Sequence, residues 1–174
     1  GHSPHEEAPE RFVEHVTLAA RDFLARATDL FAQAPIRHLD LTGTRDLAKD
    51  LFASPHLAKI RSLRLDRFGL GDDEMVLLAG SKHLGELAWL DLMRNGIDMD
   101  GARALAASKN FPKLRYIGFF GNAVDPTEEI FTDQGIVVDK ALPPEGRKLE
   151  AEFGPIPWLH VDAHTSWDVP PRRY

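Results

Sequence analysis

The chain alternates short strand-like segments with longer segments of helical hydrophobic pattern. The strand-like segments share the spacing apolar-x-x-apolar-x-apolar, which occurs at 36–41, 60–65, 87–92 and 114–119. Their middle residues, Leu39, Leu63, Leu90 and Ile117, are 24, 27 and 27 residues apart. A repeat of this period predicts a solenoid, in which each unit adds one strand and one helix to a stack.

The segments between these strands carry an apolar face with helical spacing, followed by a turn that recurs with the same period. The apolar faces comprise Leu47, Leu51 and Phe52; Met75, Leu78 and Ala79; and Ala102, Leu105 and Ala106. The turns begin at Ser54, Ser81 and Ser108, and successive serines are 27 residues apart. We therefore expect right-handed connections between parallel strands, with the helices on the convex side and the sheet on the concave side. Gly101 suits a helix start, and Asp72 or Asp100 suits an N-cap.

The same pattern extends towards both ends of the chain. Residues 13–18 repeat the strand spacing, and a helix over 20–34, ended by Pro35, follows. Beyond residue 125 the pattern predicts an edge strand at 135–138, a helix over 145–153 and a sixth strand at 156–161. We divide the chain into a disordered lead-in (1–10), repeats with a degenerate first repeat as N-terminal cap (11–125), a C-terminal cap (126–165) and an extended tail (166–174). The first residues, 1–5, resemble a tag remnant followed by a flexible lead-in.

The segment from Leu87 to Asn95 matches the pattern L-x-x-L-x-L-x-x-N completely, and 117–122 matches it with apolar exchanges. These residues resemble the leucine-rich repeat family, and units of 24–27 residues with helical backs resemble its ribonuclease-inhibitor-like subclass. Segments 11–18 and 154–160 are similar to uncharacterised bacterial members. Thr44 and Phe68 stand where the family has asparagine, which predicts a weaker ladder of side-chain hydrogen bonds to the turns. The resemblance implies binding to other proteins and no catalysis.

Residues between the apolar anchors point to the opposite face of the sheet, where they form columns about 4.8 Å from strand to strand. The predicted columns are His15, His38, Ser62, Trp89, Tyr116 and Trp158; Thr17, Asp40, Arg64, Asp91, Gly118 and His160; and Ala19, Thr42, Asp66, Met93, Phe120 and Asp162. A solvent-facing cluster of aromatic residues and methionine is typical of a binding surface. The candidate partner-binding residues are Trp89, Met93, Tyr116 and Phe120, with Arg64, Asp91 and Arg94 for orientation.

Two alternatives remain open for these residues. Residues 126–174 could fold over the aromatic cluster, which would make the chain a structural or regulatory segment of a larger bacterial protein with a sealed concave face. The alternating charges of Asp40, Arg64 and Asp91 are also explained by a cross-strand ladder of ion pairs without a ligand.

Composition narrows the classes of function. The net charge is −6, with 27 acidic against 21 basic residues, which argues against nucleic acid as the partner. The chain contains no run of 18 apolar residues, so we expect no membrane-spanning segment. Cysteine is absent, which excludes thiol catalysis and cysteine-ligated zinc and favours the cytoplasm.

One string has the residue types of a metal site. On a strand, His160, Asp162 and His164 would share one face, and histidine with carboxylate suits a transition metal. Three residues with a period of two are common by chance, and the chain contains no His-Glu-x-x-His motif, nucleophile elbow or phosphate loop. We therefore expect a monomeric, non-catalytic module without a cofactor, which binds a protein or peptide on its concave sheet.

Overall fold

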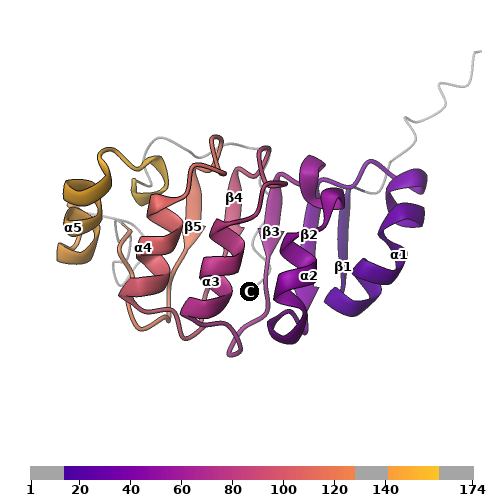
Figure 1. Cartoon of the computed structure of the whole chain (residues 1–174), viewed down its shortest axis with the longest axis horizontal. Helices are drawn as coiled ribbons and strands as arrows, with labels where there is room; N and C mark the ends of the chain where they lie inside the picture. Colours follow the sequence, from indigo (N-terminus) through magenta and orange to yellow (C-terminus); the bar gives the residue numbers. More distant parts are fainter. Residues whose placement is uncertain (1–13, 128–140, 161–174) are drawn as a thin grey trace, which may run out of the picture.

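A five-stranded, all-parallel sheet whose strands alternate with helices forms an α/β fold. The structure is a computed structural model and describes residues 14–127 and 141–160. The elements are β1 (His15–Ala19), α1 (Ala20–Gln33), β2 (His38–Thr42), η1 (Arg45–Leu47), α2 (Ala48–Phe52), η2 (Pro55–Lys59), β3 (Ser62–Arg64), α3 (Asp72–Ala79), β4 (Trp89–Asp91), α4 (Met99–Ala107), β5 (Tyr116–Gly118), α5 (Pro144–Phe153) and η3 (Pro157–Leu159). The strands lie side by side in chain order, β1-β2-β3-β4-β5 (Figure 1).

The strand register follows the sequence repeat. Val16, Leu39, Leu63, Leu90 and Ile117 are paired directly across the five strands. The predicted parallel ladder is therefore confirmed. A slip of one residue would turn every anchor to the other face, so burial of the anchors fixes this register.

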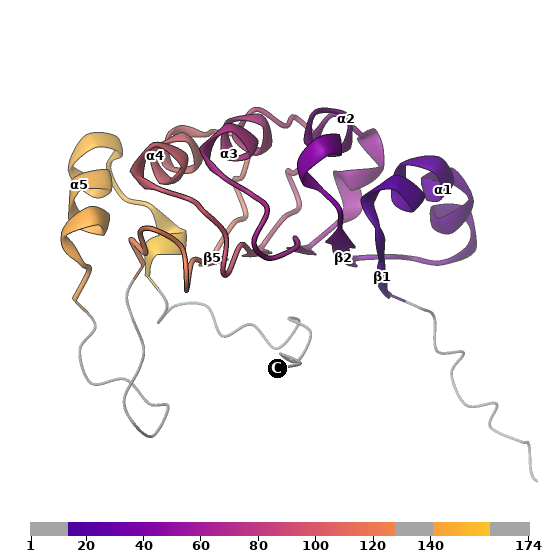
Figure 2. The same ribbon diagram turned by 90° about the horizontal axis from the view of Figure 1, so that it is seen from below.

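The core lies between the sheet and one layer of helices. Helices α1 to α4 all lie on the same side of the sheet (Figure 2). Leu63 and Leu90 on the strands are 0% exposed, as are Met75 and Leu78 on α3. We call the opposite side of the sheet, turned away from α1–α4, the front face.

Serine residues at the repeated turns tie each helical segment to the one before it. The Ser81 hydroxyl donates to the carbonyl oxygen of Phe52 at 2.7 Å, and the Ser108 hydroxyl donates to that of Ala79 at 2.6 Å. Phe52 and Ala79 are the last residues of α2 and α3. The turn serines therefore satisfy carbonyl groups that helix ends leave without an intrahelical partner.

The expected helix starts need correction. Asp98, not Asp100, is the N-cap of α4 and accepts a hydrogen bond from the Met99 amide at 2.7 Å. Asp72 lies inside α3, and its carboxylate accepts from the Asp98 amide at 2.8 Å. A Cβ atom at Gly101 would lie 2.4 Å from this Asp72 carboxylate. Gly101 thus permits the close approach of α3 and α4 and is not a helix-start signal.

The turns after the strands are held by polar side chains from the following unit. Asn95 accepts from the Gly69 and Leu70 amides at 3.2 and 3.1 Å, and Asn122 accepts from the Ile97 amide at 3.1 Å. Asp66 takes this role for the turn after β2, where its carboxylate accepts from the Gly43 amide at 3.0 Å. The expected weakening of the ladder is thus offset by Asp66. The prediction that Asp66 belongs to the third front-face column is wrong, because its carboxylate bonds to the turn of the preceding unit.

Thr44 and Phe68, which stand where asparagine was expected, lie in different environments. Thr44 is fully buried, and its hydroxyl oxygen has no hydrogen-bond partner in the structure as described. Phe68 is 83% exposed, and its backbone has a φ of 66°, a conformation that side chains other than glycine rarely adopt. Its amide donates to the carbonyl oxygen of Arg94 at 2.7 Å, so the turn keeps its backbone bond.

The C-terminal part confirms one expectation and contradicts another. The predicted helix over 145–153 is α5, which ends at Gly154 with a φ of 78°. The predicted sixth strand is wrong for its described residues, because η3 occupies 157–159. Pro157 cannot donate to a strand ladder but suits the first position of such a turn. The edge strand expected at 135–138 lies outside the described residues.

Both elements close the β5 end of the core. Helix α5 packs against α4, and η3 packs against β5. The Trp158 ring lies 5.7 Å from the ring of Phe119, on the inner side of the sheet, and Trp158 is 5% exposed. Trp158 therefore belongs to the core and does not extend the first front-face column.

Candidate interaction surface

The front face carries two of the predicted columns in the predicted order. His15, His38, Ser62, Trp89 and Tyr116 are direct partners across the five strands. The second column, Thr17, Asp40, Arg64, Asp91 and Gly118, is paired in the same way. The third column pairs only Ala19 with Thr42, because β3, β4 and β5 end before it.

An aromatic stack stands at the centre of the candidate surface. The rings of Trp89 and Tyr116 lie 5.5 Å apart and 15° from parallel. The guanidinium carbon of Arg64 lies 5.5 Å from the centre of the Trp89 ring. Stacked rings and a cation over an aromatic face each add about 0.5–1.5 kcal/mol to area burial. The strands therefore bring three candidate residues into one ordered cluster.

The charged candidates form a row beside this stack. Arg64 Nε lies 3.1 Å from Asp91 Oδ2, and Arg64 Nη1 lies 3.6 Å from Asp40 Oδ2. The other carboxylate oxygen of Asp91 accepts from the Met93 amide at 2.9 Å. Asp40 also contacts His15 Nε2 at 3.1 Å. The cross-strand ladder anticipated as an alternative is therefore present, and it fixes the guanidinium of Arg64.

Met93 joins the cluster through Gly118. A Cβ atom at Gly118 would lie 3.0 Å from the Met93 terminal methyl and 3.3 Å from the Tyr116 hydroxyl oxygen. The absence of a side chain at Gly118 therefore lets Met93 and Tyr116 lie over the β5 backbone. A larger residue at this position would displace both of them.

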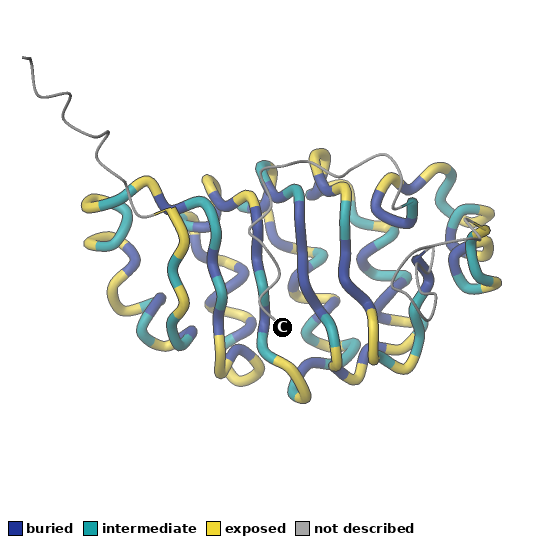
Figure 3. Tube along the Cα trace, turned by 180° about the vertical axis from the view of Figure 1, so that it is seen from behind, coloured by how far each residue is buried: buried dark blue, intermediate teal, exposed yellow. Residues whose placement is uncertain are grey.

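The candidate residues differ in exposure. Trp89 is 6% exposed and Asp91 is 5% exposed, so both are buried although they belong to the front face. Burial increases from β1 towards the centre of the sheet (Figure 3). Tyr116 and Met93 are half-buried, and Phe120 is 45% exposed. The expectation that all four apolar candidates face solvent is thus wrong for Trp89.

Phe120 and Arg94 lie at the strand ends and not in the stack. The Arg94 amide donates to the Phe120 carbonyl oxygen at 2.7 Å, and the Arg94 backbone has a φ of 57°. A Cβ atom at Gly121 would lie 2.9 Å from Arg94 Cγ, so the Arg94 side chain runs along this turn. These two residues therefore border the cluster at the carboxyl end of the strands.

The candidate metal residues are placed only in part. His160 Nε2 contacts Glu150 Oε1 on α5, and His160 follows η3 and not a sheet strand. Asp162 and His164 lie outside the described residues. Within 14–127 and 141–160, no group of three or more histidine, aspartate or glutamate side chains is arranged to hold a metal ion.

His38 connects the first column to the charges where the strands begin. Its Nδ1 lies 2.8 Å from the Ser62 hydroxyl oxygen, and its ring meets that of His15 edge-on at 6.4 Å. Burial lowers the pKa of His38 below its ordinary value of 6.5, and His15, Arg61 and Arg37 lower it further, while Glu14 raises it. The folded protein therefore holds a proton on His38 less readily than the unfolded chain does.

This lowered pKa predicts a loss of stability on acidification. Because the unfolded chain binds more protons at His38, the free energy of unfolding falls as pH drops from about 7 through the folded pKa. We expect the His38→Asn variant to lose less stability than the wild type between pH 7.5 and pH 5, as measured by urea unfolding. His83→Asn is the control for the loss of an imidazole at a turn outside the sheet. Equal pH profiles for His38→Asn and the wild type would contradict the assignment.

The candidate surface combines stacked rings, a partly accessible apolar area and charged groups of fixed orientation. None of the helices in the described part of the chain is both long and apolar enough to cross a bilayer. Comparison with known proteins adds no further assignment, since no family model and no curated protein matches the chain. The contacts among Arg64, Trp89, Met93 and Tyr116 are therefore the basis for a functional proposal.

Proposed function

We propose that the chain is a leucine-rich repeat module of the ribonuclease-inhibitor-like subclass that binds a protein or peptide. In this proposal the strand–helix units wind into a right-handed solenoid, with the front face of the sheet as its concave side. Support comes from the common register of the five anchors and from Asn95 and Asn122, which bond to turns of the preceding units. The module acts as a monomer in the bacterial cytoplasm and uses no cofactor.

The stack of Trp89 on Tyr116 under Arg64 is the observation that carries this proposal. A partner that contacts Tyr116 meets a ring already held in place, so little conformational entropy is lost on binding. Trp89 is too buried to provide much contact area, and its role is to support Tyr116 from beside it. Met93 and Phe120 extend the accessible apolar area towards the ends of the strands.

Arg64 and Asp91 would orient a peptide bound to the same surface. Asp91 and Asp40 hold Arg64 from both sides, so its remaining donor groups have a defined orientation. Fixed charged groups contribute more to specificity and register than to affinity. A peptide with an aromatic or aliphatic side chain next to a neutral hydrogen-bond acceptor fits this arrangement, while Arg94 lies at the strand end as a second cation.

Selection of short random peptides on the immobilised full chain tests this proposal. We expect the selected peptides to lose about thirtyfold in affinity on Tyr116→Ala, since a central aromatic residue contributes about 2 kcal/mol. The double variant Trp89→Ala/Tyr116→Ala should abolish binding. Phe68→Ala is the matched control, because Phe68 is an exposed aromatic residue at a turn outside the cluster.

Circular dichroism identifies variants that fail to fold. If the double variant fails to fold, the single variant Tyr116→Ala still tests the proposal. Peptides that bind the folded Tyr116→Ala variant as well as the wild type would contradict the proposed surface.

A structural role of the front face is the second candidate. The burial of Ser62, Trp89 and Asp91 on this face favours it, because buried residues offer little area to a partner. Under this proposal the chain is a structural or regulatory segment of a larger protein, and the cluster stabilises the sheet. Selection would then yield no peptide that distinguishes Tyr116→Ala from the wild type.

A further inference from the structure

A pocket of about 510 Å³ opens at the end of the molecule where β2 and β3 begin. Its walls come from the connection between α1 and β2 and from η2 with the connection to β3. The rings of Phe31 and His56 are stacked in one wall, 5.8 Å apart and 13° from parallel, and Pro35 and Pro55 add apolar surface. The volume lies within the range of about 300–1,000 Å³ that is usual for small-molecule sites.

Three cations surround this pocket. Arg37 and Arg61 directly precede β2 and β3, and Lys59 ends η2. The Arg61 amide donates to the carbonyl oxygen of Arg37 at 2.8 Å, so the two arginines lie on neighbouring strands. In the described part of the chain, Arg37, Lys59 and Arg61 form no ion pair with an acidic side chain. Their charges are therefore available to a ligand.

The acidic residue in the pocket wall does not neutralise these cations. Both carboxylate oxygens of Glu86 accept from Lys113 Nζ at 2.9 Å. Lys113 lowers the pKa of Glu86 through this hydrogen bond and its charge, and Arg61 and Arg37 lower it further. The two arginines also lower the pKa of His38, so their positive field extends across this end of the sheet.

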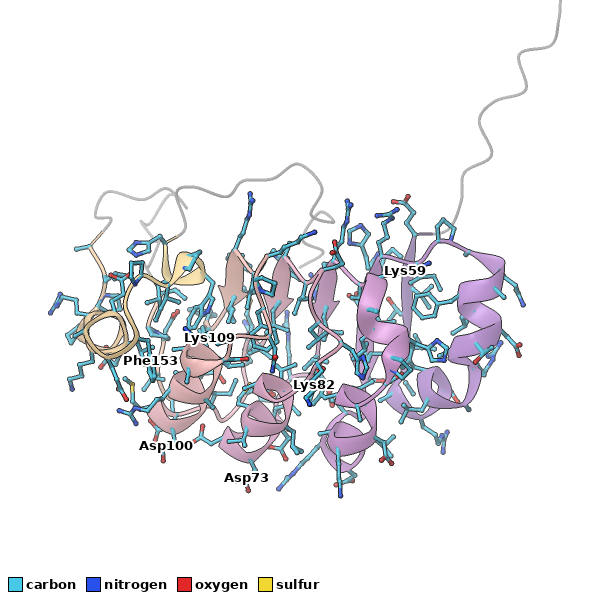
Figure 4. All side chains as sticks on the ribbon, turned by 45° about the horizontal axis from the view of Figure 1, so that its top comes forward. Lys59, Asp73, Lys82, Asp100, Lys109 and Phe153 are labelled. Carbon is cyan, nitrogen blue, oxygen red and sulfur yellow. The ribbon has the colours of Figure 1, made fainter. Side chains whose placement is uncertain are left out.

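This positive region contrasts with the rest of the molecule. The chain has a net charge of −6, and acidic residues gather where the helices begin, at Asp72, Asp73, Asp98 and Asp100. Figure 4 shows Lys59 at one end of the strand–helix units and Asp73 and Asp100 at the other. A local positive potential on an acidic protein selects for anions at that place.

We propose that this pocket binds an aryl phosphate, with the aromatic ring against the Phe31–His56 wall and the phosphate between Arg37, Lys59 and Arg61. An aromatic monophosphate carries a charge of about −1.5 to −2 at neutral pH, which matches three cations better than a carboxylate does. Arginine binds phosphate oxygens in a bidentate manner, and lysine adds a point charge. The pocket lies at the edge where the strands begin and is independent of the peptide-binding proposal for the front face.

Titration of phenyl phosphate into the ¹⁵N-labelled full chain tests this site. We expect saturable shifts of the Ala58, Lys59 and Arg61 amide resonances in NMR spectra. Arg61→Gln should weaken binding about tenfold, the effect expected from loss of one charge-assisted contact to phosphate. Arg115→Gln is the matched control, because Arg115 directly precedes β5 as Arg61 precedes β3, is exposed and lies outside the pocket wall. It should bind like the wild type.

Two further ligands separate the contributions of the phosphate and the ring. Inorganic phosphate should bind more weakly than phenyl phosphate, and benzyl alcohol should give no saturable shift. Phe31→Leu should bring the affinity for phenyl phosphate close to that for inorganic phosphate. The proposal is overturned if phenyl phosphate gives no saturable shift, if Arg61→Gln and Arg115→Gln bind it alike, or if inorganic phosphate binds equally well.

Discussion

Replacing Leu90 by alanine is expected to lower the free energy of unfolding by about 4 kcal/mol, near the upper part of the range for large-to-small core substitutions. Leu90 is 0% exposed and lies on β4, between Leu63 on β3 and Ile117 on β5. Neighbours on both sides are held in the sheet ladder, so they cannot move in to fill the space. The lost contacts and the remaining cavity therefore both count against the folded state.

Urea unfolding followed by circular dichroism measures this effect. Leu77→Ala is the matched control, because Leu77 lies on α3 with 40% exposure and should lose less than about 1 kcal/mol. Equal losses for the two variants would mean that the central anchor is not the packed residue that the register indicates.

The second large effect is expected at Asn95, where alanine should lower the free energy of unfolding by about 3 kcal/mol. Asn95 is 7% exposed, accepts from the Gly69 and Leu70 amides, and donates to the Leu92 carbonyl oxygen at 3.1 Å. Alanine removes the acceptor that the Gly69 and Leu70 amides share and leaves these two backbone groups unpaired, whereas the Leu92 carbonyl oxygen keeps its hydrogen bond from the Asn122 side chain at 2.8 Å. The cost is therefore larger than that of one ordinary hydrogen bond, which is about 1 kcal/mol.

Asn110→Ala provides the comparison for this variant. The Asn110 side chain donates one hydrogen bond, to the Ala79 carbonyl oxygen at 2.9 Å, and that oxygen also accepts from the Ser108 hydroxyl. Its loss should cost about 1 kcal/mol, since no backbone group becomes unpaired. A loss at Asn95 no greater than that at Asn110 would show that water replaces the asparagine at this turn.

The two proposed sites use different features of one repeat. The front-face cluster depends on the residues between the anchors, and the pocket depends on the residues just before each strand. Because neither substitution set touches the other site, loss of peptide binding on Tyr116→Ala and loss of phenyl phosphate binding on Arg61→Gln are independent results.

Much of the architecture was predictable because it depends on local periodicity. The alternation around Leu39, Leu63, Leu90 and Ile117 gives each strand an inner and an outer side, and the recurrence of the same anchor pattern every 24–27 residues brings the anchors into one register. The helical faces between the strands, and the helix before Gly154, follow from patterns within a single segment. Pro157 is a local signal against a sixth strand, and its effect outweighs the apolar spacing at 156–161.

The sequence was sufficient to predict which residues lie together in the candidate site, but not how far each of them is buried. The columns placed Arg64, Trp89 and Tyr116 side by side, and the structure brings them into contact. The same columns treated Trp89 as exposed and Asp66 as a front-face residue. Trp89 is buried and contacts Tyr116 and Arg64 on the neighbouring strands, and the Asp66 carboxylate accepts from the Gly43 amide in the preceding unit. Neither set of contacts is visible within one repeat.

The basic pocket was also predictable only in part. Arg37, Arg61 and Arg115 precede the first front-face residues of three strands, and this shared repeat position was a signal that could have been found in the sequence. The net charge of −6 does not indicate such a cluster, because composition averages over the whole chain. The units, their register and the inner side of each strand thus follow from spacing along the chain alone. The folded arrangement is needed to show which outer side chains are buried, which amides Asp66 satisfies and where the cations gather, because these depend on contacts between units far apart in sequence.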